Sequence, residues 1–255
     1  MMVRMKFLKT GPLKFIGHLD IMRYFQKAFR RAGIDVEYSK GFSPHQILSF
    51  AAPLGVGLTS EGEYLDVSLN TILDSDVMMK MINDAMNEYI RITDFRILPE
   101  GSKNAMSIVA GADYKISLKD GYEFLSKDEF IQKFHAYMEQ EEIVVTKKSK
   151  KSENEVDIKP LIYKYAFDRK SFYEGETQSE GINSEDEACQ IYDNGICCYL
   201  KLATGSVNNL KPELVLDGLK NYLKIELNDF AFQVHRIEVY ANDKEREKLI
   251  PLLLV

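Results

Sequence analysis

Apolar residues in the first hundred positions follow two different spacings. Between residues 18 and 32 they recur at steps of three and four, which is the spacing of one face of an amphipathic helix. Gly33 follows this stripe and is expected to end the helix. The apolar residues of the stripe are Leu19, Met22, Phe25, Phe29 and Ala32.

The other apolar segments of this region are short and alternate with polar residues, which predicts strands. Strands are expected over residues 2–16 (broken near Gly11), 34–38, 47–51, 63–69 and 90–98, and a second helix over residues 74–89. With 47–51 and 63–69, which are joined through Pro53, Gly55 and Gly57, counted as one strand, the order is strand, helix, strand, strand, helix, strand. This is the order of a ferredoxin-like unit.

Residues 101–255 repeat this order more loosely, without detectable sequence similarity to the first hundred. The expected elements are strands at 114–118, 143–148, 157–167, 195–203 and 230–240 and helices at 127–140 and 212–223. We therefore predict an α+β protein made of two tandem ferredoxin-like (βαββαβ) halves with antiparallel sheets. One domain is expected over residues 1–100 and a second over residues 101–255.

Composition places the chain among globular proteins. It has 255 residues, of which 45% are hydrophobic and 28% charged. No run of about 18 apolar residues is present, so no transmembrane helix is expected. The first residues alternate apolar and basic side chains and lack the apolar core of a signal peptide. We expect a cytoplasmic protein that does not contact the membrane.

Recognisable catalytic and cofactor motifs are missing. The sequence has no P-loop, no G-x-G-x-x-G loop, no H-E-x-x-H and no G-x-S-x-G. The cysteine spacing that holds a radical-forming iron–sulfur cluster is also missing. Cys189, Cys197 and Cys198 have no metal-ligand spacing and are expected to be packing residues. We expect no metal and no cofactor, which favours a non-enzymatic role.

Charge is distributed unevenly around a net value of −6. Residues 1–46 contain nine Lys and Arg against three Asp and Glu, a local balance of +6. A lysine-rich excursion at 146–154 adds a second basic segment, whereas residues 174–187 are acidic. A local positive field binds polyanions even when the total charge is negative.

The helix over 18–32 carries a basic stripe. Arg23, Lys27 and either Arg30 or Arg31 lie three or four residues apart and so share a face. Arginine forks suit phosphate groups. We expect Lys6 and Lys40 nearby. The alternative interpretation is an ordinary solvated face.

His18 and Asp20 lie at the start of the same helix. A histidine is the natural proton carrier near neutral pH, and the free N–H groups of a first helical turn accept a phosphate. In the alternative interpretation, His18 caps the helix and Asp20 complements the helix dipole.

The segment Tyr38-Ser-Lys-Gly-Phe-Ser-Pro-His-Gln46 is predicted to be an exposed loop. Gly41 permits a positive φ, and Phe42 is expected to anchor the loop in the core. Lys40, Ser43 and His45 then project outward. Three interpretations stay open: a catalytic histidine, a phosphate or base contact, and a structural turn. If the loop folds over the helix, His45 faces His18.

Five segments occur in an order that resembles the bacterial family of radical SAM-linked proteins. They are Phe15-Ile-Gly-His-Leu-Asp20, Phe29-Arg-Arg-Ala-Gly33, Tyr38-Ser-Lys-Gly-Phe-Ser-Pro-His45, Leu48-Ser-Phe-Ala-Ala-Pro-Leu54 and Ser60-Glu-Gly-Glu-Tyr-Leu-Asp66. Asp157-Ile-Lys-Pro160 and Leu210-Lys-Pro212 fit the same pattern, while Gly17 stands where the family has serine. The resemblance implies a stand-alone partner of a cobalamin-binding radical SAM enzyme. Tandem ferredoxin-like halves are also similar in outline to the CRISPR RNA-processing endoribonucleases, a fold-level analogy.

These observations lead to one hypothesis and two alternatives. The first is a non-catalytic RNA-binding accessory protein that presents tRNA or rRNA to the radical SAM enzyme. The second is a metal-independent endoribonuclease with His18 or His45 as general base. The third is a protein-docking module for the radical SAM enzyme without RNA contact. The expected RNA-binding residues are Arg23, Lys27, Arg30, Arg31, Lys40, Ser43, His45 and Lys159.

Overall fold

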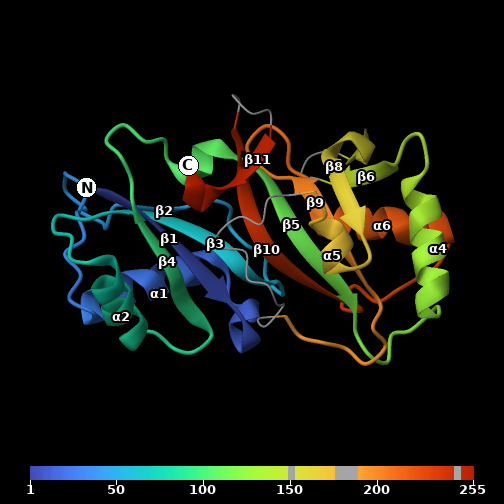
Figure 1. The fold of residues 1–255 in the computed structure, drawn as a ribbon, viewed down its shortest axis with the longest axis horizontal. Coiled ribbons are helices and arrows are strands. Elements are labelled where there is room, and N and C mark those ends of the chain that lie inside the picture. Colours follow the sequence, from blue (N-terminus) through green and yellow to red (C-terminus); the bar gives the residue numbers. More distant parts are fainter. Residues whose placement is uncertain (149–152, 176–188, 244–247) are drawn as a thin grey trace.

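The structure is a computed structural model that describes residues 1–148, 153–175, 189–243 and 248–255. In these residues the chain forms an α+β fold with one mixed nine-stranded sheet and six α-helices. Figure 1 shows the sheet running from β4 at one side to β8 at the other. The strand order is β4-β1-β3-β10-β5-β9-β8, with β2 added to β3 and β11 added to β10.

The elements have the following bounds. The strands of the large sheet are β1 (Met2–Lys9), β2 (Leu48–Phe50), β3 (Thr59–Ser68), β4 (Ile90–Ile97), β5 (Val109–Leu118), β8 (Ile162–Ala166), β9 (Cys197–Ala203), β10 (Phe232–Asp243) and β11 (Lys248–Pro251). A separate hairpin consists of β6 (Val144–Lys148) and β7 (Glu153–Asp157). The helices are α1 (His18–Arg31), α2 (Ser75–Asp84), α3 (Ala105–Ile108), α4 (Lys127–Met138), α5 (Arg169–Phe172) and α6 (Pro212–Leu223). Short 3₁₀ helices cover Gly11–Phe15, Lys159–Leu161 and Leu252–Leu254.

The N-terminal elements pack around β1, which pairs antiparallel with both β3 and β4. One face of β1 contributes Phe7, whose ring lies 4.8 Å from that of Phe25 on α1. The predicted helix at 18–32 is confirmed, and Gly33 follows it with a φ of +67°. The predicted strand at 34–38 is reduced to two isolated bridges, Val36 with Leu69 and Tyr38 with Gln46.

The C-terminal elements pack around β5, which pairs antiparallel with β10 and β9. The apolar faces of α4 and α6 cover one side of these strands, with Phe134 and Leu219 buried. The predicted strand at 143–148 leaves the large sheet and forms the β6–β7 hairpin. The predicted strand at 157–167 is divided into the end of β7, a 3₁₀ turn and β8.

The two groups of strands join into one sheet through a parallel pairing of β10 with β3, at His235–Thr59 and Arg236–Ser60. The prediction of antiparallel sheets is therefore wrong at this junction, where one mixed sheet contains both groups of strands. Gly62 makes the close approach of these strands feasible, because a Cβ added at this position would lie only 2.3 Å from the carbonyl oxygen of Ile237. The alternation of residues along β10 is the same for an edge strand and a central strand, so the sequence does not reveal this pairing.

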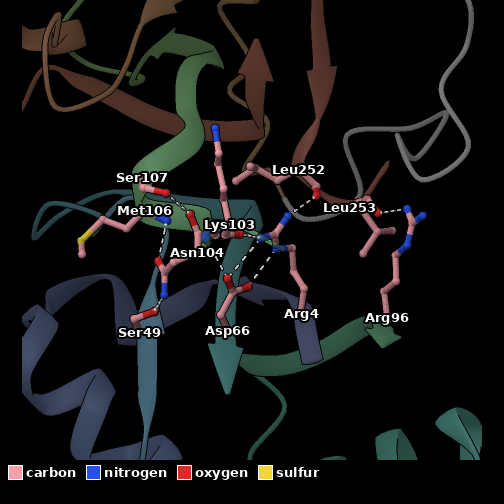
Figure 2. Close-up of polar contacts among 11 residues, drawn as sticks. Arg4, Ser49, Asp66, Arg96, Lys103, Asn104, Met106, Ser107, Leu252 and Leu253 are labelled. Carbon is pink, nitrogen blue, oxygen red and sulfur yellow. Dashed lines mark hydrogen bonds and ion pairs between the residues drawn. The ribbon is translucent and has the colours of Figure 1, made fainter. Parts of the chain in front are cut away.

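Buried polar contacts cover the opposite face of β1 and β3 (Figure 2). The Arg4 guanidinium lies against the Asp66 carboxylate, with Nε 2.8 Å from Oδ1, and also donates to the Leu252 and Lys103 carbonyl oxygens. The backbone N–H of Ala105 donates to Asp66 at 2.7 Å. The residues that follow 101–104, beginning with the buried Ala105, are thus packed onto the sheet, and so is the C-terminal turn at Leu252–Leu254.

Candidate functional site

The outer face of α1 carries the predicted basic stripe. Arg23, Lys27, Arg30 and Arg31 are all exposed. Arg23 lies 3.4 Å from Asp20 in an exposed ion pair, while Arg31 donates to the Ala85 carbonyl at the end of α2. An exposed ion pair of this kind leaves the arginine available to other anions because its net stabilisation is small.

Three of the nine N-terminal cations, Arg4, Lys6 and Lys9, are buried. Lys6 lies one residue from Phe7 on β1 and so points away from α1. Its Nζ is 2.7 Å from Glu238 Oε2, and the expectation that Lys6 lies beside α1 is wrong. Burial lowers the pKa of Lys9, whose Nζ donates to the Ile16 carbonyl. The surface charge near α1 is therefore smaller than the residue count implies.

The loop 38–46 is closed at its base. Tyr38 and Gln46 form an isolated β-bridge, and Ser39 N donates to the His45 carbonyl at 2.8 Å. The Ser39 hydroxyl lies 2.9 Å from His45 Nδ1 and accepts from the His45 backbone N–H. Gly41 turns the tip with a φ of +119°, as predicted for a glycine in this turn. The base of the loop is thus held in a defined conformation.

Gln46 attaches the loop to α1. Its buried side chain donates from Nε2 to the Gln26 carbonyl at 3.5 Å and to the Tyr38 hydroxyl at 3.3 Å. The same Gln26 carbonyl accepts from Arg30 Nε. The basic face of α1 and the loop therefore form one surface, which we call the α1–loop surface. It consists of Arg23, Lys27, Arg30, Arg31 and residues 38–46.

Phe42 does not anchor the loop, contrary to the sequence-based expectation. Its relative exposure is 113%, so the ring projects entirely into solvent. The anchoring role belongs to Gln46, which is buried, whereas Lys40, Ser43 and His45 are exposed as expected. Nothing in the sequence distinguishes an exposed phenylalanine from a buried one when it stands in a short loop without periodicity.

The two histidines occupy different environments. The ring of His18 packs edge-on against Phe50, with centroids 5.1 Å apart, and lines a small pocket with Lys9 and Glu63. His45 has its hydrogen bonds within the loop. A mechanism that joins both rings therefore lacks support, and each histidine stays a separate weak candidate.

Lys159 lies in a different part of the fold. Its Nζ donates to the Met138 carbonyl at the end of α4, and its backbone N–H donates to Asp157. Lys159 thus satisfies a carbonyl oxygen at the C-terminus of α4, as lysine side chains near helix ends commonly do. The central part of the lysine-rich excursion (149–152) and most of the acidic segment (176–187) lie outside the described residues.

A cavity of about 420 Å³ lies where the two groups of strands meet. Its walls come from the loop after β2 (51–55), the turn at 204–206 and the start of α6, and Tyr114 and Arg236 also line it. Arg236 Nε is 2.7 Å from Glu63, which neutralises the arginine. The cavity is largely apolar and presents few charged groups, as small-molecule sites do. Its residues are distant in sequence, so sequence reasoning missed it.

The described residues provide no further candidate site in the form of a reactive cysteine, a metal site or a membrane-spanning helix. Cys198 is buried in the core, and burial raises the pKa of its thiol. Within the described ranges, no group of three His, Cys, Asp or Glu side chains is placed to hold a metal ion. Of the helices in that part of the chain, none is long and apolar enough to cross a membrane.

A protein-family model matches most of the chain. The model of a family described as "Uncharacterized protein conserved in bacteria (DUF2344)" matches residues 2–212, which include α1, the loop, the loop after β2 and the first residue of α6. No curated protein matches the sequence. Because the family match covers most of the chain, the protein belongs to the bacterial DUF2344 family.

Proposed function

We propose that this protein binds RNA through the α1–loop surface as a non-catalytic accessory protein, with tRNA or rRNA as the ligand. The observation that carries the proposal is the attachment of the loop to α1 by Gln46, which places exposed cations of both segments on one surface. Exposed Arg and Lys side chains bind the phosphate backbone through charge and counterion release.

The acidic residues of this region besides Asp20 have hydrogen-bond partners outside the α1–loop surface. Asp35 accepts hydrogen bonds from Asn70 and Thr71, and Glu37 accepts one from Ser68. The loop 38–46 itself contains no acidic residue. The α1–loop surface therefore has five exposed cations, of which only Arg23 is shown in an ion pair with an acidic residue of the described chain, and this excess of positive charge favours a polyanionic ligand.

Binding of labelled tRNA and rRNA fragments, measured by fluorescence anisotropy at several salt concentrations, tests this proposal. The double variant Arg23→Ala/Lys27→Ala is expected to bind more weakly. If two phosphate contacts to single-stranded RNA are lost, the slope of log affinity against log salt falls by about 1.4.

The matched control is Lys127→Ala/Lys133→Ala, which removes two exposed positive charges from α4. It should retain the affinity and the salt slope of the unaltered protein. Equal losses in both double variants, or unchanged affinity in the α1 variant, would place the RNA elsewhere or exclude it.

A radical SAM enzyme is the proposed recipient of the RNA, and this partner rests on the resemblance of the N-terminal segments to radical SAM-linked proteins. Co-purification from native cells tests it. We expect the enzyme and RNA to be captured together and the capture to weaken after nuclease treatment. Capture that is unchanged by nuclease favours the protein-docking alternative.

RNA cleavage is a second candidate function, favoured by one observation. His45 is exposed and its Nδ1 is held by Ser39, an arrangement that orients an imidazole as a general base. This alternative predicts metal-independent cleavage that leaves a cyclic phosphate and is lost in His45→Ala. RNA that stays intact after long incubation with the purified protein rules it out for that RNA.

We also propose that residues 1–100 and 101–255 are two ferredoxin-like units. The division is supported by the strand order within each unit, which is β4-β1-β3-β2 in the first and β10-β5-β9-β8 in the second. Neighbouring strands within each unit are antiparallel. Native-state hydrogen exchange checks the division, because strands of one unit should open together. If β10 opened with β3 before it separated from β5, the division would be incorrect.

A further inference from the structure

Phe42 is the most exposed large apolar side chain among the described residues, at 113% relative exposure. It stands at the tip of the loop 38–46, between Lys40 and His45. Single exposed apolar residues are common on protein surfaces and need no explanation by themselves. Two further features, the closed base of the loop and the charge around it, set this residue apart.

The loop that carries Phe42 is already ordered without a ligand. The Tyr38–Gln46 bridge, two hydrogen bonds between Ser39 and His45 that involve their backbones, and the contact of Gln46 with α1 hold its base. A preorganised loop loses little conformational entropy when it binds, so a side chain displayed by it contributes more to affinity. Phe42 therefore resembles a fixed aromatic platform.

The charge around Phe42 indicates what the ring meets. The loop has a lysine and a histidine and no acid, and the face of α1 attached to it carries four exposed cations. Proteins that hold single-stranded nucleic acid combine cations that follow the phosphates with aromatic rings on which bases stack. A phenyl ring has no hydrogen-bonding group, so it serves stacking and gives no base-specific hydrogen bond.

We infer that Phe42 stacks on an unpaired base, so that the α1–loop surface takes single-stranded or looped RNA rather than a continuous duplex. This inference rests on the proposed RNA-binding function and narrows its ligand. Bases inside a continuous A-form helix are stacked on their neighbours and present no free face to a side chain.

The test compares Phe42→Ala with the unaltered protein on a single-stranded RNA and on a duplex of the same sequence. Loss of one base–aromatic stack lowers the affinity for the single strand by about 5- to 150-fold. Affinity for the duplex should stay nearly unchanged. Because Phe42 is fully exposed, the variant should unfold at the same temperature as the unaltered protein, so folding does not confuse the comparison.

A fluorescent reporter gives an independent readout, because the chain contains no tryptophan. In Phe42→Trp the single indole should be quenched when single-stranded RNA binds, and affinity should be retained. The control is Phe230→Trp, since Phe230 is also exposed (72%) but lies in the turn just before β10, away from the α1–loop surface. Its indole should show no quenching.

Each outcome bears on a different statement. Salt-dependent RNA binding with equal affinity in Phe42→Ala and no quenching in Phe42→Trp overturns the stacking inference and leaves the proposed function intact. Equal losses on single strand and duplex overturn the preference for unpaired RNA. No RNA binding by the unaltered protein overturns the proposed function, and the inference with it. Loss of a captured protein partner in Phe42→Ala, with RNA affinity unchanged, assigns the ring to protein docking instead.

Discussion

At the scale of single residues, the interior of the protein contains buried polar side chains that pair with one another. Tyr64 donates to Glu238 at 2.7 Å, and Tyr173 and Tyr240 both donate to the Asp113 carboxylate. Glu238 also pairs with Lys6, so its carboxylate contacts side chains of two other strands, β3 and β1. Such contacts offset the cost of burying polar atoms only while every partner keeps its protonation state.

Alkaline pH should therefore destabilise the fold. Burial raises the pKa of Tyr64, Tyr137, Tyr173 and Tyr240 above the ordinary value of 10, and nearby carboxylates raise it further. The protonated hydroxyl is favoured in the folded state, so its stabilisation is complete below pH 10 and is lost as pH rises above 10. Urea unfolding at neutral pH and above pH 10 measures the difference.

The ultraviolet titration of tyrosine provides the matching control. Of the fourteen tyrosines in the chain, these four should resist ionisation until the protein unfolds. The absence of tryptophan keeps the spectrum simple. Smooth ionisation of all fourteen near pH 10 in folded protein would contradict the assignment.

At the scale of elements, local sequence accounts for the helices better than for the strands. α6 was predicted with its observed bounds, and α1 and α4 end within two residues of their predictions. Their apolar stripes and end signals lie within one segment, so neighbours far along the chain do not change them. Strands require a partner, and the segment 34–38 has only isolated bridges because β2 and β10 occupy the free edge of β3.

The start of α4 offers an element-level test. Ser126 and Glu129 form a capping box in which each side chain bonds to the backbone N–H of the other. Ser126→Ala should lower the free energy of unfolding by about 1 kcal/mol. Urea denaturation should show a lower midpoint with an unchanged slope. Ser102→Ala, at an exposed position before α3, should leave the midpoint in place.

At the scale of the whole molecule, the junction between β3 and β10 holds the two groups of strands together. Ion pairs cross it, from Lys6 to Glu238 and from Arg236 to Glu63. The closing contact is between backbones, where Gly62 meets Ile237. The continuous sheet should therefore unfold in a single transition.

Gly62→Ala should weaken this junction, because the added Cβ meets backbone atoms that cannot move without shifting a strand. The expected loss of unfolding free energy is at least about 2 kcal/mol. Gly55→Ala is the matched control, since its Cβ meets only Leu58 Cδ1 at 3.7 Å. Calorimetry or urea denaturation that finds equal stabilities for the two variants would show that the close approach is not required.

The candidate site likewise contains some features that the sequence predicts and others that it does not. The basic stripe of α1 and the exposed positions Lys40, Ser43 and His45 follow from helical spacing and turn chemistry, so the sequence predicts them. Lys6 was misplaced because a cation on a strand is exposed or buried according to what covers its face. Phe42 was misplaced for the same reason: its burial depends on where the loop docks, and Gln46 makes that contact.

The sequence by itself determined the α+β class, the positions of the long helices and the basic face of α1, because these depend on periodicity and on residues within a few positions of one another. Tertiary structure alone decided the single mixed sheet, the cavity beside Arg236, the burial of three N-terminal cations and the exposure of Phe42. Each of these results from contacts between segments far apart in the chain, and local patterns do not specify such contacts.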